Sequence, residues 1–112
     1  MFDAFINTCQ RWRLERNSQL RLLGFPEGDF LGSQLLMGRV PARTQDVKDR
    51  IGYVLAVSLG LGTIFNEAVA PELDWLTNIH PKLRESPLQH MLGGRMIHLI
   101  AVAGLVAAER NL

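Results

Sequence analysis

The sequence has only one cysteine and a formal net charge of only +1, and each of these low values excludes a class of protein. Because Cys9 has no partner for an internal disulfide, the chain is not a disulfide-stapled extracellular scaffold, and we expect a cytoplasmic protein. The balanced charge excludes a polycation, so affinity for nucleic acid would need a local basic patch. The start MFDAFINTCQRWR lacks the basic and apolar segments of a secretory signal.

Long hydrophobic runs are also missing. The two apolar runs cover residues 52–65 and 96–108, and both are shorter than the roughly 20 residues that cross a bilayer. We therefore expect buried helices and no membrane partner. No alternation of β-branched residues is long enough for a sheet, which predicts an all-α fold. A chain of 112 residues is one small domain by size.

Apolar residues recur at helical spacing along most of the chain. The predicted helices cover about residues 3–15, 17–24 and 27–38, followed by a long one opening at Thr44 and one starting near Ala70 or Pro71. Asn17 or Ser18 is the expected start of the second helix. The long helix carries Gly52, Gly60 and Gly62, each lowering helix stability by about 0.5–1 kcal/mol, so another backbone should approach it closely. That backbone belongs either to the same chain or to a second copy.

Residue patterns for catalysis are absent from the sequence. His80, His90 and His98 do not stand beside carboxylates in a catalytic or zinc-binding spacing. Cys9 lies on an apolar helix face, which favours a core position over a reactive thiol. The glycines of GLGTIF and MLGGRM do not follow a predicted strand, so they do not indicate a phosphate loop. We expect a binding protein without enzymatic activity, metal or cofactor.

The segment WLTNIHPKLRESPLQHMLGGRM, residues 75–96, is typical of a junction between helices. Ser86 can cap exposed helix amides, and Pro87 suits the first helical position because its missing N–H has no partner there. The helix that they start ends at Gly93 and Gly94, and the chain restarts at Arg95. A last helix then runs to the C-terminus.

This segment resembles the toxin-binding domain of the Xre/MbcA/ParS antitoxin family. The resemblance rests on Trp75, Leu76, Asn78, Pro81, Ser86, Pro87, Leu88, Met91, Leu92, Gly94, Arg95 and Met96. It implies a helix-turn-helix-like N-terminal part over residues 1–45. A long helix and a C-terminal toxin-binding part then cover residues 46–112, and by size we expect the two parts to form one compact unit. The match is specific in the C-terminal half and loose over residues 26–43.

The resemblance implies that the C-terminal part binds a RES-type toxin, which degrades NAD or transfers ADP-ribose, and covers the entrance to its active site. The expected toxin-binding residues are Trp75, Arg84, Glu85, Leu88, Met91, Leu92, Arg95, Met96 and Arg110. A core position is the alternative for Trp75, Met91 and Met96. Family precedent also implies a homodimer, and the small residues Ala101, Gly104 and Ala108 would permit close helix packing.

DNA is the second expected partner, with the helix over residues 27–38 in the recognition position. Between Glu27 and Met37 there are two acids and no Lys or Arg, so Ser33 and Gln34 are the candidates for reading bases. Phosphate contacts are expected from Arg21, Arg39, Arg43 and Lys48, with a solvated surface as the alternative. Two other functions stay open: a transcriptional regulator of operator DNA without a toxin, and a helical adaptor between proteins.

Overall fold

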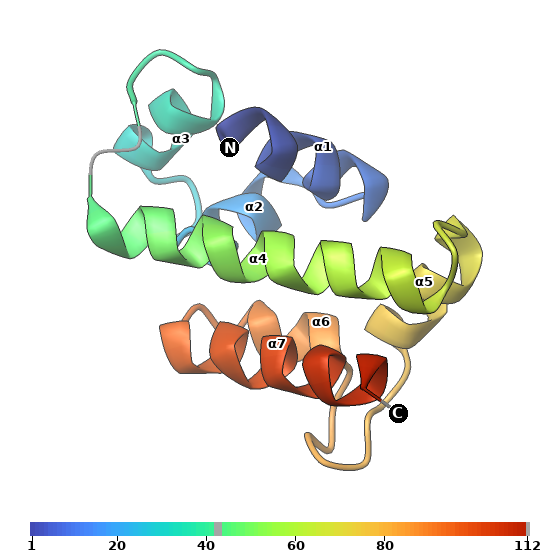
Figure 1. Cartoon of the computed structure of the whole chain (residues 1–112). Coiled ribbons are helices and arrows are strands. Elements are labelled where there is room, and N and C mark those ends of the chain that lie inside the picture. The colour runs from blue at the N-terminus through green and yellow to red at the C-terminus, as the bar shows by residue number, and fades with distance from the viewer. Residues whose placement is uncertain (42–43, 112) are drawn as a thin grey trace.

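The computed structural model describes residues 1–41 and 44–111, which form an all-α fold (Figure 1). Its helices are α1 (Phe2–Arg11), α2 (Arg16–Leu22), α3 (Phe30–Leu36), α4 (Gln45–Ile64), α5 (Val69–Thr77), α6 (Pro87–Met91) and α7 (Met96–Arg110). The fold class expected from the sequence is confirmed. Within the described residues, no helix is long and apolar enough to cross a membrane.

Local sequence signals set several of the helix boundaries. The hydroxyl of Thr44 accepts a hydrogen bond from Val47 N–H at 3.2 Å, and that of Ser86 accepts one from Gln89 N–H at 3.1 Å. Pro87 occupies the start of α6. Gly94 has a φ of 87°, which glycine adopts without strain, and the chain turns there into α7. These starts and stops confirm the junction expected over residues 75–96.

Three helices in the N-terminal half are shorter than the sequence predicts. Helix α1 ends at Arg11, because Arg13 turns into the left-handed region with a φ of 58°. Helix α3 begins at Phe30, where the carboxylate of Asp29 accepts the Gly32 N–H at 2.8 Å. Asn17 does not start α2, since its side-chain oxygen accepts the Gly28 N–H at 3.1 Å in the next loop.

Helix α4 runs through the middle of the molecule, with α1, α2 and α3 on one side and α6 and α7 on the other (Figure 1). Helix α7 lies parallel to α4. At one end Arg50 Nη1 donates to the Gly94 carbonyl at 2.8 Å, and further along the pair Gly60 packs against Val106. A Cβ on Gly60 would overlap the Val106 side chain. The glycines of α4 are therefore approached within the chain, but by side chains and not by the backbone that was expected: Val106 at Gly60 and Glu67 at Gly62, whereas a Cβ on Gly52 would meet nothing within 4 Å.

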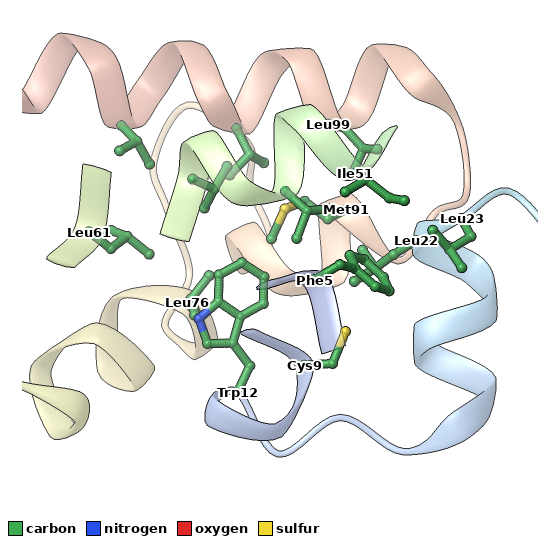
Figure 2. Packing of buried hydrophobic residues seen from close by; sticks show 14 of the residues in the cluster. Phe5, Cys9, Trp12, Leu22, Leu23, Ile51, Leu61, Leu76, Met91 and Leu99 are labelled. Atoms are coloured by element: carbon green, nitrogen blue, oxygen red, sulfur yellow. The ribbon is translucent and has the colours of Figure 1, made fainter. Parts of the chain in front are cut away.

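One hydrophobic core joins the two layers. Figure 2 shows side chains of α1, α4, α5, α6 and α7 meeting in it, among them Phe5, Trp12, Ile51, Leu76 and Met91. Cys9 is also fully buried, and this burial raises the pKa of its thiol to about 12. The radius of gyration of 13.4 Å is close to the roughly 13 Å expected for a single compact domain of this length.

A buried carboxylate ties α1 to α5. Glu72 is fully buried, and it accepts hydrogen bonds from Arg11 Nε and Trp12 Nε1, both at 2.9 Å. Arg11 also donates to the Glu67 carbonyl at 3.0 Å. The hydrogen bond to Glu72 raises the pKa of Arg11. The buried charge is thus neutralised and hydrogen-bonded, the condition under which a carboxylate is tolerated inside a protein.

Replacing the buried carboxylate should destabilise the fold. We expect Glu72→Ala to lower the free energy of unfolding by about 3 kcal/mol, because Trp12 Nε1 loses its acceptor and Arg11 its counter-charge. Asp74→Ala, which changes an exposed carboxylate of the same helix, is the control and should alter it by less than about 0.5 kcal/mol. Urea unfolding of both variants measures the difference, and equal stabilities would contradict the role of Glu72.

Two glycines of α4 should respond in opposite directions to the same substitution. Gly60→Ala is expected to lower the free energy of unfolding by about 1–2 kcal/mol, because its methyl group overlaps Val106. Gly52→Ala should raise it by about 0.5–1 kcal/mol, since the added Cβ enters open space and improves helix propensity. Thermal or urea unfolding tests the pair, and a destabilised Gly52 variant would show that this glycine also has a packing role.

Candidate protein-docking surface

The loop between α5 and α6, residues 78–86, presents an apolar side chain and several charges to solvent. Ile79 is 76% exposed, and Lys82, Arg84 and Glu85 are exposed beside it. The loop closes on itself through an isolated antiparallel bridge, in which His80 N–H donates to the Glu85 carbonyl at 3.0 Å. Leu83 and Arg84 N–H both donate to the His80 carbonyl, at 3.1 and 2.9 Å. These four residues form a closed turn.

His80 fixes this turn to α5 and α7. Its Nδ1 accepts the Lys82 N–H at 3.1 Å, so the neutral ring carries its proton on Nε2, which lies 3.7 Å from Glu109 Oε1. The same oxygen of Glu109 accepts the indole N–H of Trp75 at 3.2 Å, and the Trp75 and His80 rings meet edge to face. The Glu109 carboxylate therefore ties α7 to the last turn of α5 through Trp75, and the loop that follows is held to α5 by the contact between the His80 and Trp75 rings.

A second attachment holds the far end of the loop on α6. Glu85 Oε2 lies 2.8 Å from His90 Nδ1, and the His90 ring packs against His98 of α7 with 4.5 Å between centroids. His98 Nδ1 is buried and has no hydrogen-bond partner among the residues that the structure describes. Desolvation, followed by the charges of His90 and Arg95, lowers the pKa of His98. The histidine pair is consequently a packing contact that favours the neutral form of His98.

Arg84 has an unusual backbone for its residue type. Its φ is 60°, in the left-handed region that residues other than glycine and asparagine rarely occupy. Such a conformation persists only where the surroundings impose it, and it costs of order 1–3 kcal/mol. Here the two hydrogen bonds to the His80 carbonyl impose it, and the side chain of Arg84 stays exposed. The loop is therefore preorganised, with an apolar and a cationic group at its surface.

The structure separates the predicted toxin-binding residues into three groups. Arg84, Glu85, Arg95 and Arg110 are exposed. Trp75, Leu88, Leu92 and Met96 are half-buried and pack against the core. Met91 is a correction: it is fully buried, because α6 lies flat against α7 and turns this side chain toward Ile51 and Leu76 (Figure 2). Met91 therefore takes the core position that the sequence left open as the alternative, and it is not accessible to a partner.

The predicted DNA-binding residues do not form one basic surface. Arg21 Nε donates to the Leu92 carbonyl at 2.9 Å and Nη1 lies 3.8 Å from Glu27, so this guanidinium is engaged within the chain. The side chain of Arg21 is still 42% exposed, and a phosphate contact from it stays a prediction. Arg39 and Lys48 are exposed, Ser33 and Gln34 are half-buried, and Arg43 lies outside the described residues.

Helix α3, placed in the recognition position by the sequence, has an apolar outer surface. Phe30 is 77% exposed and Leu31 is 59% exposed. A cavity of about 610 Å³ lies beside α3 and the start of α4, and its lining is mostly apolar, including Phe25, Leu35 and Val47. Base edges and phosphates are read by polar and cationic side chains. The exposed face of α3 is therefore better suited to a protein than to a DNA groove.

Two features of this surface were not predicted from the sequence. Arg50 is buried, where it pairs with Asp46 at 2.9 Å and with the Gly94 carbonyl, which attaches α4 to the start of α7. The spacing of Asp46 and Arg50 by four residues was the available signal. Ile79 is an isolated apolar residue between Asn78 and His80 in a polar loop, and this pattern was the available signal for an exposed apolar side chain.

Within the described residues, His, Cys, Asp and Glu do not form a metal-binding group of three.

Comparison with known proteins gives one distant relative. The chain is 28% identical over 111 residues to the uncharacterized protein y4oB of Sinorhizobium fredii (strain NBRC 101917 / NGR234), covering 97% of this chain and 83% of the relative. No protein-family model matches the chain. The similarity extends over both layers of the fold, so the relative matches the chain through the N-terminal helices as well as the loop.

Stability should decrease in mild acid because of His98. Its pKa in the folded protein lies below the value of 6.5 for a free histidine, so the unfolded chain binds more protons as the pH falls through 6.5. The contribution is complete above that pH and is lost as the pH approaches the folded pKa. Urea unfolding at about pH 7.5 and pH 5 should show a smaller loss for His98→Gln than for the unchanged protein. Equal losses would assign the pH dependence to other groups.

Proposed function

We propose that this protein is the antitoxin of a toxin–antitoxin pair and neutralises a RES-type, NAD-consuming toxin by binding over the entrance to its active site. The proposal combines the resemblance of residues 75–96 to the Xre/MbcA/ParS toxin-binding domain with the surface formed by residues 78–86. It assigns the protein to the cytoplasm. The antitoxin acts as a steric block, so it needs no catalytic group, metal or cofactor of its own.

The preorganised loop is the observation that carries the proposal. Binding normally requires a flexible loop to lose conformational entropy, and a loop that is already fixed avoids most of that penalty. Residues 78–86 are held at one end by the edge-to-face contact of His80 with Trp75 and at the other by the contact of Glu85 with His90. A surface loop with this many internal restraints is expected where a fixed shape has to be presented to another molecule.

The loop also carries the two kinds of group that dominate protein interfaces. Ile79 would fill an apolar depression at the rim of the toxin cleft, since exposed aliphatic side chains contribute affinity when they are buried by a partner. Arg84 would pair with a carboxylate of the toxin, where a planar guanidinium can form two parallel hydrogen bonds. Glu85 and Lys82 flank them as polar contacts that fix orientation.

The half-buried members of the predicted set act differently. Trp75, Leu88, Leu92 and Met96 pack the loop, α6 and the start of α7 onto the core, so they preserve the shape of the surface. Arg95 and Arg110 stand at opposite ends of α7 and are exposed. We assign Ile79 and Arg84 the main contacts, with Arg95 or Arg110 as contacts at the rim.

An adaptor between proteins is the second candidate, and the apolar outer face of α3 favours it. Phe30 and Leu31 are exposed next to the cavity at Val47, which would suit an apolar segment of another protein. A transcriptional regulator is less well supported, because Arg39 and Lys48 are the exposed cations of the described DNA-binding set. If operator DNA binds, its affinity should fall steeply with salt, since phosphate contacts would dominate.

Co-expression with the RES-type toxin tests the proposal directly. The unchanged protein should restore growth, whereas Ile79→Asp and Arg84→Glu should each weaken toxin binding by at least about tenfold, the loss typical of a central interface residue. Gln10→Glu, on the exposed face of α1 across the molecule, is the matched control and should neutralise normally. Titration calorimetry with an inactive toxin measures the affinities.

The folded state of each variant has to be checked by circular dichroism, so that loss of binding is not loss of structure. Continued growth arrest in the presence of abundant folded protein would refute the antitoxin function. Full binding by both loop variants would leave the antitoxin function standing and refute the docking surface at residues 78–86.

A further inference from the structure

We propose that the cavity between α3 and the start of α4 is a binding site for a small, uncharged, apolar molecule. The cavity belongs to the N-terminal half of the chain. Helix α3 and the pair of α6 and α7 lie on opposite sides of α4, so this site is separate from the loop at residues 78–86 (Figure 1). The inference depends neither on the toxin nor on the proposed function.

The cavity has the size and the lining of a small-molecule site. Its volume of about 610 Å³ falls within the roughly 300–1,000 Å³ of the clefts that enclose such ligands. Three stretches of the chain surround it: the end of α2 with the residues that follow, one side of α3, and the start of α4 with the residues before it. The large apolar side chains of the lining are those of Leu23, Phe25, Leu31, Leu35, Val40 and Val47.

Contacts outside the cavity keep its walls apart. A Cβ on Gly32 would lie 2.6 Å from a methyl group of Leu20 and 2.8 Å from the ring of Phe25, so α3 is pressed directly onto the neighbouring segment at this point. On the α4 side, the guanidinium of Arg50 packs against Gly24, where an added Cβ would lie 2.8 Å from Cζ. Helix α3 therefore cannot shift toward α4 and fill the space without losing packing elsewhere.

The polar side chains of the lining are already engaged, and this sets the chemistry of the ligand. Thr44 and Asp46 are the polar residues of the described lining. The Thr44 hydroxyl accepts the Val47 N–H at 3.2 Å, and Asp46 Oδ2 pairs with Arg50 Nε at 2.9 Å. A hydrogen-bonding group of a ligand would lose water without gaining a free partner among these side chains, and an anion would also lie near the Asp46 carboxylate. An uncharged, apolar molecule avoids both penalties.

The interior of the cavity suits a small molecule better than a polypeptide. Every residue of a polypeptide carries a C=O, and almost every one an N–H, and these groups need partners when they are buried. A segment of another protein can cover the mouth, where Phe30 and Leu31 are exposed, without placing its backbone inside. Deeper in the cavity, beside the buried Leu35 and Val47, the walls are apolar. Apolar cavities in proteins exclude water and take up apolar compounds.

Two fluorescent probes with the same aromatic skeleton test the inference. N-phenylnaphthylamine is uncharged, and anilinonaphthalene sulfonate adds a sulfonate to the same rings. The emission of both rises in apolar surroundings. Titration of the full chain should show saturable binding of about one molecule of N-phenylnaphthylamine per chain, and binding of the sulfonate should be at least about tenfold weaker. Absence of saturable binding of the uncharged probe, or equal or tighter binding of the sulfonate, would overturn the proposal.

Two adjacent residues of α3 distinguish the cavity from the outer surface of the helix. Leu31 lines the cavity and is 59% exposed, so Leu31→Asp adds a carboxylate to the site without entering the core. It should weaken binding of N-phenylnaphthylamine at least about tenfold. Phe30 is 77% exposed and does not line the cavity, so Phe30→Asp is the matched control and should change the affinity by less than about twofold. Equal effects of the two substitutions would refute binding inside the cavity.

Methyl NMR of the unchanged protein locates the probe without a variant, so the test holds even if Leu31→Asp does not fold. Addition of N-phenylnaphthylamine should shift the methyl resonances of Leu35 and Val47, which line the cavity, through the ring currents of the probe. The methyl resonances of Leu99 and Val102 in α7, on the other side of α4, should not move (Figure 1). Unchanged resonances of Leu35 and Val47 at saturation would exclude this cavity as the site.

Discussion

The contact of α4 with α7 determines where every other element can lie. Helix α4 is apolar around much of its circumference and has to be covered on two sides, by the N-terminal helices and by α7. Gly60 lets Val106 pack directly onto the α4 backbone, and Arg50 ties the other end of the pair to the Gly94 carbonyl. With α7 held parallel to α4, its inner face completes the core and its outer face stays open.

Polar groups inside the protein connect the N-terminal and C-terminal parts. Glu72 joins α5 to Arg11 and Trp12 of α1, and Arg21 of α2 donates to the carbonyl of Leu92 at the end of α6. Glu72 is buried and is tolerated there because it is paired, whereas the side chain of Arg21 is partly exposed; each of the two side chains joins two elements. Arg11 and Arg21 thus contact α5 and the residue that follows α6, so the described N-terminal helices pack against the C-terminal part of the chain.

This arrangement concentrates the exposed, shaped surface in the C-terminal half. The Trp75–His80 ring contact and the Glu85–His90 contact hold the two ends of the loop at residues 78–86. The proposed toxin contact lies in this loop, and the exposed face of α3 would remain available to a further protein.

The sequence by itself determined the all-α class, the start of α4 at Thr44 and the start of α6 at Ser86 and Pro87, because caps and turns depend on residues within three or four positions. It also identified Arg84 and Glu85 as surface residues, since polar loops are exposed in most folds. Tertiary structure decided between the two positions left open for Met91, which is buried, and it alone decided that Arg21 Nε donates to the Leu92 carbonyl. Those outcomes depend on partners far along the chain, such as Leu92 for Arg21 at a separation of 71 residues, and local pattern carries no information about them.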